Sequence, residues 1–204
     1  VGSEMCIRDR SSVDGGNKQL TLHFANTGSQ GAHFHVYSSN RTDGPWGYTV
    51  EAGKTLRDSF DINVTAGIYA FTVYGPNGFV REFAGSLTPP GSGSVSNPPA
   101  DPELAAQYDV ANGNLFLKFT NRGRGIAHLS VVDNAYGVRP RPVLVPSLGS
   151  IQESWILGAS HHWYDLSITS NDDPTFLRRL AGHVENGRPS ISDPAAVAPV
   201  TALA

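Results

Sequence analysis

The chain has 204 residues, a formal net charge of −3 and 39% hydrophobic residues, which fits one large domain or two small ones. A weakly acidic chain lacks the basic surface typical of proteins that bind nucleic acids or anionic membranes. No apolar run approaches the ~20 residues of a transmembrane helix, and 22 glycines with 14 prolines indicate many turns and little long helix.

The N-terminal residues VGSEMCIRDR look foreign to the rest of the chain. They hold its only Met and its only Cys, and they have no counterpart in the repeat described below. We therefore assign residues 1–12 to a foreign or disordered segment and leave them out of the fold prediction. Without this segment the chain has no Cys, which excludes a disulfide scaffold, a thiolate metal site and a Cys nucleophile.

The next part of the chain carries short runs of alternating side chains, the pattern of half-buried β-strands. The predicted strands are Gln19–Ala25, Ala32–Ser38, Gly47–Val50, Thr55–Phe60, Ile68–Tyr74 and Phe79–Ala84. Clusters of Gly, Pro, Asn and Asp separate these runs, as at Gly75–Gly78, where a hairpin loop is expected. These features predict a first β-sandwich domain over residues 13–87.

A linker is predicted between residues 88 and 102, where the sequence reads TPPGSGSVSNPPADP. Proline removes backbone donors, and glycine and serine keep the chain flexible, so this composition resists packing into a core.

Residues 103–186 repeat the plan of the first domain. At a constant offset of 95 residues, LTLHFANTGSQGAHFHV (Leu20–Val36) aligns with LFLKFTNRGRGIAHLSV (Leu115–Val131). The predicted strands are Gln107–Val110, Asn114–Thr120, Ala127–Val132, Arg141–Val145, Ile151–Ile156, Trp163–Thr169 and Phe176–His183. We therefore predict an all-β fold of two tandem immunoglobulin-like antiparallel β-sandwich domains, followed by a C-terminal tail over residues 187–204.

Comparison of the two copies leads to two further predictions. Tyr108–Asp109 aligns with Val13–Asp14, so the strand-like residues before Tyr108 align with the foreign segment. The first domain is therefore expected to lack its first strand and to expose a strand edge. Arg81 and Arg178 occupy matched positions, and we expect them to anchor the fold rather than bind a ligand.

His33 and His35 are the candidate metal ligands, because residues two apart on a strand share a face. Zinc takes three or four ligands, and no further ligand stands at a reliable spacing. The second copy keeps His128 but has Ser130 in place of His35, which favours a structural role for the histidines. No catalytic residue, cofactor or metal is assigned, and a small metal-dependent hydrolase that uses His33 and His35 stays as an alternative.

Aromatic residues give a second alternative. Trp46 and Tyr48 follow Gly44-Pro45 at a loop edge, where an aromatic ring can stack on a sugar or contact a choline ammonium group. They are the candidates for a lipid head-group or carbohydrate-binding surface. For Trp155 and Tyr164 the expectation is core packing, since a sandwich commonly buries such rings.

The motif L-x-F-x-N-x-G-(x)3-A-H occurs in both copies, and YGPNGFVREFAG and AGHVENGRPSISDPA follow the first and the second copy. These motifs resemble the duplicated C-terminal region of bacterial phosphocholine-specific phospholipases C, the hemolytic and non-hemolytic secreted enzymes. The resemblance covers residues 13 to about 195 and implies an N-terminally truncated fragment.

The resemblance also implies a role. In that family a larger phosphatase-like domain carries the metal site and cleaves phosphatidylcholine or sphingomyelin, and its catalytic motifs are absent from this sequence. The chain is therefore expected to be a non-catalytic accessory region that packs on and supports the catalytic domain of the same polypeptide. A secreted or periplasmic location and contact with a phosphocholine lipid surface are further implications.

Overall fold

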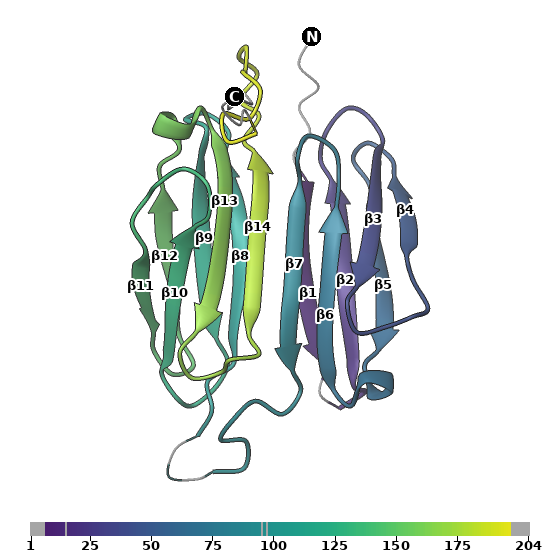
Figure 1. The fold of residues 1–204 in the computed structure, drawn as a ribbon, viewed down its shortest axis with the longest axis vertical. Helices are drawn as coiled ribbons and strands as arrows, with labels where there is room; N and C mark the ends of the chain where they lie inside the picture. The colour runs from purple at the N-terminus through teal and green to yellow at the C-terminus, as the bar shows by residue number, and fades with distance from the viewer. Residues whose placement is uncertain (1–6, 15, 95, 97, 197–204) are drawn as a thin grey trace, which may run out of the picture.

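Short strands make up most of the chain in the computed structural model, which describes residues 7–14, 16–94, 96 and 98–196, with the backbone alone for residues 7–12 and 14 (Figure 1). The strands of the first domain are β1 (Ile7–Asp14), β2 (Gln19–Asn26), β3 (Ala32–Ser38), β4 (Trp46–Val50), β5 (Thr55–Asp61), β6 (Ile68–Tyr74) and β7 (Val80–Ser86). The strands of the second domain are β8 (Pro102–Asp109), β9 (Asn114–Asn121), β10 (Ala127–Asp133), β11 (Arg141–Val145), β12 (Ser150–Trp155), β13 (Trp163–Ser170) and β14 (Leu177–His183). Helix in the described residues is limited to the 3-10 turns η1 (Asn63–Thr65) and η2 (Gly158–Ser160). The all-β prediction is confirmed.

Each copy of the repeat folds as an antiparallel sandwich. In the first domain the sheet β1-β2-β5 lies against strands β4, β3, β6 and β7, and in the second domain the sheet β12-β9-β8 lies against β11, β10, β13 and β14. Edge strands β7 and β14 also pair with each other, from Ala84 opposite Leu177 to Val80 opposite Ala181. The two sandwiches therefore share one eight-stranded sheet, a joint that the sequence analysis did not predict.

Each sandwich has its own hydrophobic core, built from matched positions of the repeat. Burial alternates along β2 and β9, so every second side chain points inward. Buried pairs at matched positions are Leu22 and Leu117, Phe24 and Phe119, Phe34 and Leu129, Phe60 and Trp155, and Tyr69 and Tyr164. The expected core packing of Trp155 and Tyr164 is confirmed.

The prediction that the first domain lacks its first strand is wrong. Strand β1 pairs with β2 along its whole length, from Ile7 opposite Asn26 to Asp14 opposite Gln19, as β8 pairs with β9 in the second domain. Ladder pairing uses backbone N–H and C=O groups, so an open strand edge accepts an extended segment whatever its side chains. Residues 1–6 of the expected foreign segment lie outside the described residues.

The second half of the predicted linker packs on the second domain. Strand β8 begins at Pro102, earlier than predicted, and proline is tolerated at the first residue of an edge strand because no ladder donor is needed there. The Asn121 side-chain oxygen accepts the Asp101 N–H (3.0 Å), and the Gly125 N–H donates to the Pro99 carbonyl (3.2 Å). This end of the linker is therefore held by hydrogen bonds.

Gly125→Ala is expected to loosen the docked linker. A Cβ at Gly125 would collide with the Pro98 carbonyl oxygen, whereas Gly158 has open space around it. Backbone cannot yield as a flexible side chain does, so we expect the free energy of unfolding to fall by about 1–3 kcal/mol. Chemical denaturation of Gly125→Ala and of the control Gly158→Ala checks this, and equal losses in the two variants would contradict it.

The residues after β14 return to the second domain. The Trp163 indole N–H donates to the Ile191 carbonyl (3.0 Å), and the Tyr136 hydroxyl donates to the Asp193 carboxylate (2.9 Å). Residues 197–204 of the predicted tail lie outside the described residues. Among the helices that the structure describes, none has the length and apolar character needed to cross a membrane.

Candidate functional site at the domain junction

His33 and His35, the candidate metal ligands, lie on the exposed face of β3. Their ring centroids are 4.6 Å apart, and His33 Nδ1 forms a hydrogen bond with the Thr49 hydroxyl (2.9 Å). Among the residues that the structure describes, no group of three or more His, Cys, Asp and Glu side chains could hold a metal ion. The pair offers two nitrogen donors, fewer than a zinc site needs.

Trp46 and Tyr48, the candidate aromatic residues for ligand binding, lie on β4 and pack against the hydrophobic core of the first domain. The Trp46 ring meets the Phe60 ring edge-on with centroids 4.9 Å apart, and the Tyr48 ring stacks on Phe24 at 5.0 Å. The Tyr48 hydroxyl donates to the Asp58 carboxylate (2.6 Å). Burial, together with this bond, raises the pKa of the Tyr48 phenol. Both side chains are half-buried and engaged in packing, which leaves only part of each ring for a ligand.

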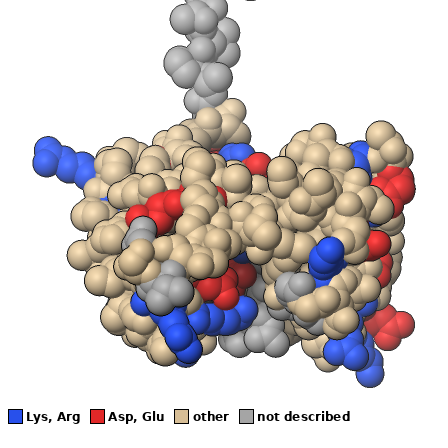
Figure 2. Space-filling model, turned by 90° about the horizontal axis from the view of Figure 1, so that it is seen from below, with Lys and Arg blue, Asp and Glu red and all other residues tan. Residues whose placement is uncertain are grey.

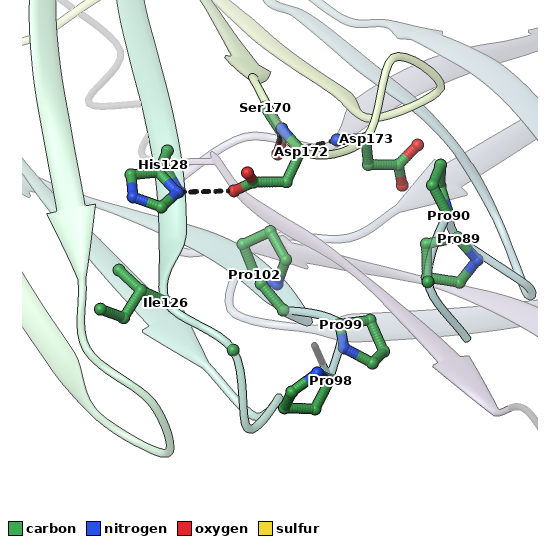
Figure 3. A pocket seen from close by; sticks show the side chains of 13 residues that line it. Pro89, Pro90, Pro98, Pro99, Pro102, Ile126, His128, Ser170, Asp172 and Asp173 are labelled. Carbon is green, nitrogen blue, oxygen red and sulfur yellow. Dashed lines mark hydrogen bonds and ion pairs between the residues drawn. The ribbon is translucent and has the colours of Figure 1, made fainter. Parts of the chain in front are cut away.

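A cavity of about 380 Å³ lies between the linker and the second domain, with linker prolines on one side and the end of β13 on the other (Figure 3). His128 Nδ1 lies 2.9 Å from Asp172 Oδ2, which also accepts the His128 backbone N–H (3.1 Å). Asp173 accepts the Thr175 N–H (2.9 Å), and the Ser170 hydroxyl oxygen accepts the Asp172 N–H (3.2 Å). These bonds stabilise a turn. Among the described residues, the His128 ring is bonded to the Asp172 carboxylate and to no Ser or Thr hydroxyl that could act as a nucleophile.

Arg178 on β14 is 4% exposed and reaches across the junction between the domains. Its Nε and Nη2 donate to the Glu103 carboxylate (3.0 and 3.2 Å), while Nη1 donates to the Ala84 carbonyl (2.8 Å) and Nη2 to the Tyr69 hydroxyl (3.1 Å). Burial alone would lower the pKa of this guanidinium, but the opposing charge of Glu103 raises it. The charge is paired and fully hydrogen-bonded, as a buried charge must be.

Arg81, the matched residue of the first copy, makes the reciprocal contacts. Its Nη1 donates to the Ala181 carbonyl (3.1 Å), and its Nη2 donates to the hydroxyls of Tyr164 (3.1 Å) and Tyr108 (2.7 Å), all in the second domain. Tyr164 and Ala181 are the second-copy counterparts of the first-domain groups that Arg178 contacts. The two domains therefore exchange equivalent contacts about an approximate two-fold axis, and the matched arginines anchor the domain pair.

The partners of these arginines were not identified from the sequence. Glu103 and Tyr108 both lie on β8, an edge strand that begins with the last residue of the predicted linker and five residues before the predicted strand. Of the two, Tyr108 aligns with Val13 in the first copy. Comparison of the two copies therefore identified the arginines as structural residues, but it did not identify the side chains that they bind.

The opposite face of β14 carries a more exposed network. Arg179 donates through Nε and Nη2 to the Asp165 carboxylate (2.9 and 2.8 Å), and its Nη1 lies 3.8 Å from Glu82 Oε2 of the first domain. Partial burial alone would raise the pKa of Asp165, but hydrogen bonds from Arg179 and Asn134 hold it below its usual value.

Asp165→Asn is expected to make the free energy of unfolding depend less on pH in the acidic range. A carboxyl with a lowered folded-state pKa contributes stability that is complete above its unfolded value of ~3.9 and is lost as the pH falls through the folded-state pKa. Because the Arg179 side chain is 38% exposed, we expect a loss of at most about 1 kcal/mol at neutral pH that shrinks in strong acid. Urea unfolding of both proteins across this range checks it, and a pH-independent difference would contradict it.

The family model of the bacterial phospholipase C C-terminal domain matches the chain over residues 8–86 and 102–183, which agrees to within one residue with the span of the strands in each sandwich. The chain is 48% identical over 183 residues to a non-hemolytic phospholipase C of Burkholderia pseudomallei and 40% identical over 182 residues to a non-hemolytic phospholipase C of Pseudomonas aeruginosa. These matches cover 89% and 88% of the chain, and 25% and 26% of the relatives.

A hemolytic phospholipase C of Pseudomonas aeruginosa is 46% identical over 149 residues, which cover 71% of the chain and 19% of that protein. The chain thus spans about a quarter of the length of the first two relatives. Family model and relatives agree with the motifs that both copies carry. The chain belongs to the bacterial phospholipase C C-terminal domain family, and it holds the repeat twice.

Proposed function

We propose that the chain is the non-catalytic accessory region of a secreted bacterial phospholipase C that acts on phosphatidylcholine or sphingomyelin, and that it packs on and supports a phosphatase-like catalytic domain. The observation that carries the proposal is the use of the buried arginines. Arg81 and Arg178 each bond groups of the other domain. These bonds join the two sandwiches, and every side-chain bond described above for Arg81 and Arg178 goes to a structural group of the fold.

The candidate chemical groups support the same role. His33 and His35 offer two metal donors without a third within the described chain, and the His128–Asp172 pair belongs to a turn. A joined pair of sandwiches offers a fixed surface on which a larger domain can pack, because the shared sheet restricts rotation of one sandwich against the other. Export to the periplasm or the medium is part of this proposal, since it follows from the family resemblance.

The test compares the isolated chain with a whole relative. In the Burkholderia pseudomallei relative, deletion of the matched quarter is expected to shorten the half-life of activity at elevated temperature more than it lowers kcat on a soluble phosphocholine ester. The isolated chain is expected to show no turnover of that ester. Turnover by the isolated chain that disappears in His35→Ala would overturn the proposal in favour of the metal-dependent hydrolase.

A further inference from the structure

Two loops at the linker end of the second domain expose large apolar side chains. Ile126 is 54% exposed and Leu148 is 69% exposed, and we call these two side chains the apolar tip. The loops are tied together, because the Leu148 N–H donates to the Gly123 carbonyl (3.0 Å) and Ala127, next to Ile126, pairs with Val145. The apolar tip is therefore a fixed feature of one end of the domain.

The repeat supplies an internal comparison for the apolar tip. Leu148 has a φ of 51°, and its first-copy counterpart Gly53 has a φ of 69°. A left-handed backbone costs energy for a leucine and little for a glycine. Ile126 likewise replaces Gly31. The second copy thus holds two exposed apolar side chains where the first copy has none, one of them in a strained conformation, and strain of this kind is typical of functional positions.

Charges of both signs surround the apolar tip. Arg122 and Arg124 are exposed in the loop that precedes Ile126, and Asp172 and Asp173 lie beside the same cavity as Ile126. Seen from the linker end, positive and negative side chains are interspersed on a largely uncharged surface (Figure 2). Such a surface, on a chain of net charge −3, suits a zwitterionic partner better than a strongly anionic one.

We propose that the apolar tip inserts Ile126 and Leu148 into a zwitterionic phosphocholine lipid surface, a proposal that rests on the accessory role in a phospholipase given above. Apolar side chains enter the boundary between head groups and acyl chains, while the adjacent guanidinium groups stay at the level of the phosphates. Two side chains offer far less area than a stable protein interface buries. A lipid surface is therefore favoured over a protein partner.

The test is flotation of the isolated chain with phosphatidylcholine vesicles at millimolar lipid. Leu148→Gly restores the first-copy residue and relieves the backbone strain, so the variant is expected to remain folded. Loss of one inserted aliphatic side chain should lower the partition coefficient about ten-fold or more, in Leu148→Gly and in Ile126→Ser alike. Ile156→Ser is the matched control, since Ile156 is 64% exposed but follows the opposite end of β12, and it should bind as the parent chain does.

Replacing part of the phosphatidylcholine with phosphatidylglycerol should change binding no more than a few-fold, since charges of both signs flank the tip. An absence of binding, or equal binding by the parent chain and Leu148→Gly, would overturn the proposal. The accessory role stands or falls separately, because its test measures thermal inactivation and turnover of a whole relative. If the isolated chain does not bind vesicles but the deletion still shortens the half-life of the relative's activity, only the proposal about the apolar tip is refuted.

Discussion

Arg178→Met is expected to lower the free energy of unfolding by about 3–5 kcal/mol. Glu103, whose side chain is 14% exposed, would be left as a buried carboxylate without its fork of donors, and the Ala84 carbonyl would lose its side-chain donor. Methionine fills much of the vacated volume, so the loss reports charge pairing more than a cavity. Since each sandwich has its own core, we also expect the urea transition of the variant to be broader than that of the parent chain, or to divide in two, as the domains uncouple.

Arg179→Met is the matched control for this variant. Arg179 is the next residue on the same strand, but its side chain is 38% exposed against 5% for Arg178, so loss of its ion pairs with Asp165 and Glu82 should cost no more than about 1 kcal/mol. Adding Glu103→Leu to Arg178→Met should recover part of the stability, because no unpaired charge then remains buried. A loss at Arg178 as small as the one expected at Arg179 would show that the buried ion pair contributes little to stability.

The strands of both domains could be predicted because their signal is local. Alternation along Ile68–Tyr74 and Arg141–Val145 places the strand bounds where the structure has them, since one buried face imposes a period of two. The pairing of β7 with β14 leaves no such trace. Edge strands join through backbone N–H and C=O groups, which every sequence carries. The same property explains β1, whose unusual composition predicted no strand and whose backbone completes the sheet.

Comparison of the two copies predicted structure best where the contacts between domains are made by side chains. Matched positions identified Arg81 and Arg178 as anchors, although their cross-domain partners depend on the junction. For the apolar tip the change from Gly53 to Leu148 was readable in the sequence. The role of Leu148 could not be predicted, because the alternation of apolar and polar residues shows neither its left-handed backbone nor its exposure.

Asn121→Ala is the second change expected to have a large effect, with a loss of about 3–5 kcal/mol. The buried Asn121 amide donates to the carbonyls of Gly125 (2.7 Å), Pro146 (3.2 Å) and Val145 (3.3 Å), and its oxygen accepts the N–H groups of Gly123 (2.9 Å) and Asp101 (3.0 Å). Alanine removes all of these side-chain bonds at a position that is itself 1% exposed, and a buried or half-buried backbone group that loses its partner costs free energy. The bonds explain the Asn-x-Gly of the repeat motif, since each Asn holds its own Gly loop, as Asn26 holds Gly28 (3.0 Å).

Asn121→Asp separates the contribution of the N–H donors of this side chain from that of its acceptor oxygen. The new carboxylate can still accept the N–H groups of Gly123 and Asp101, but when ionised it faces the carbonyl of Gly125 and has no proton to donate. Burial and these carbonyls should raise its folded-state pKa above the unfolded ~3.9, so stability should be greatest in acid and fall as the pH rises between the two values. Urea unfolding across this range, with the exposed Asn112→Ala as the control, decides the matter. A pH-independent loss in Asn121→Asp would mean that the amide fills space and that its N–H bonds to the loop carbonyls add little.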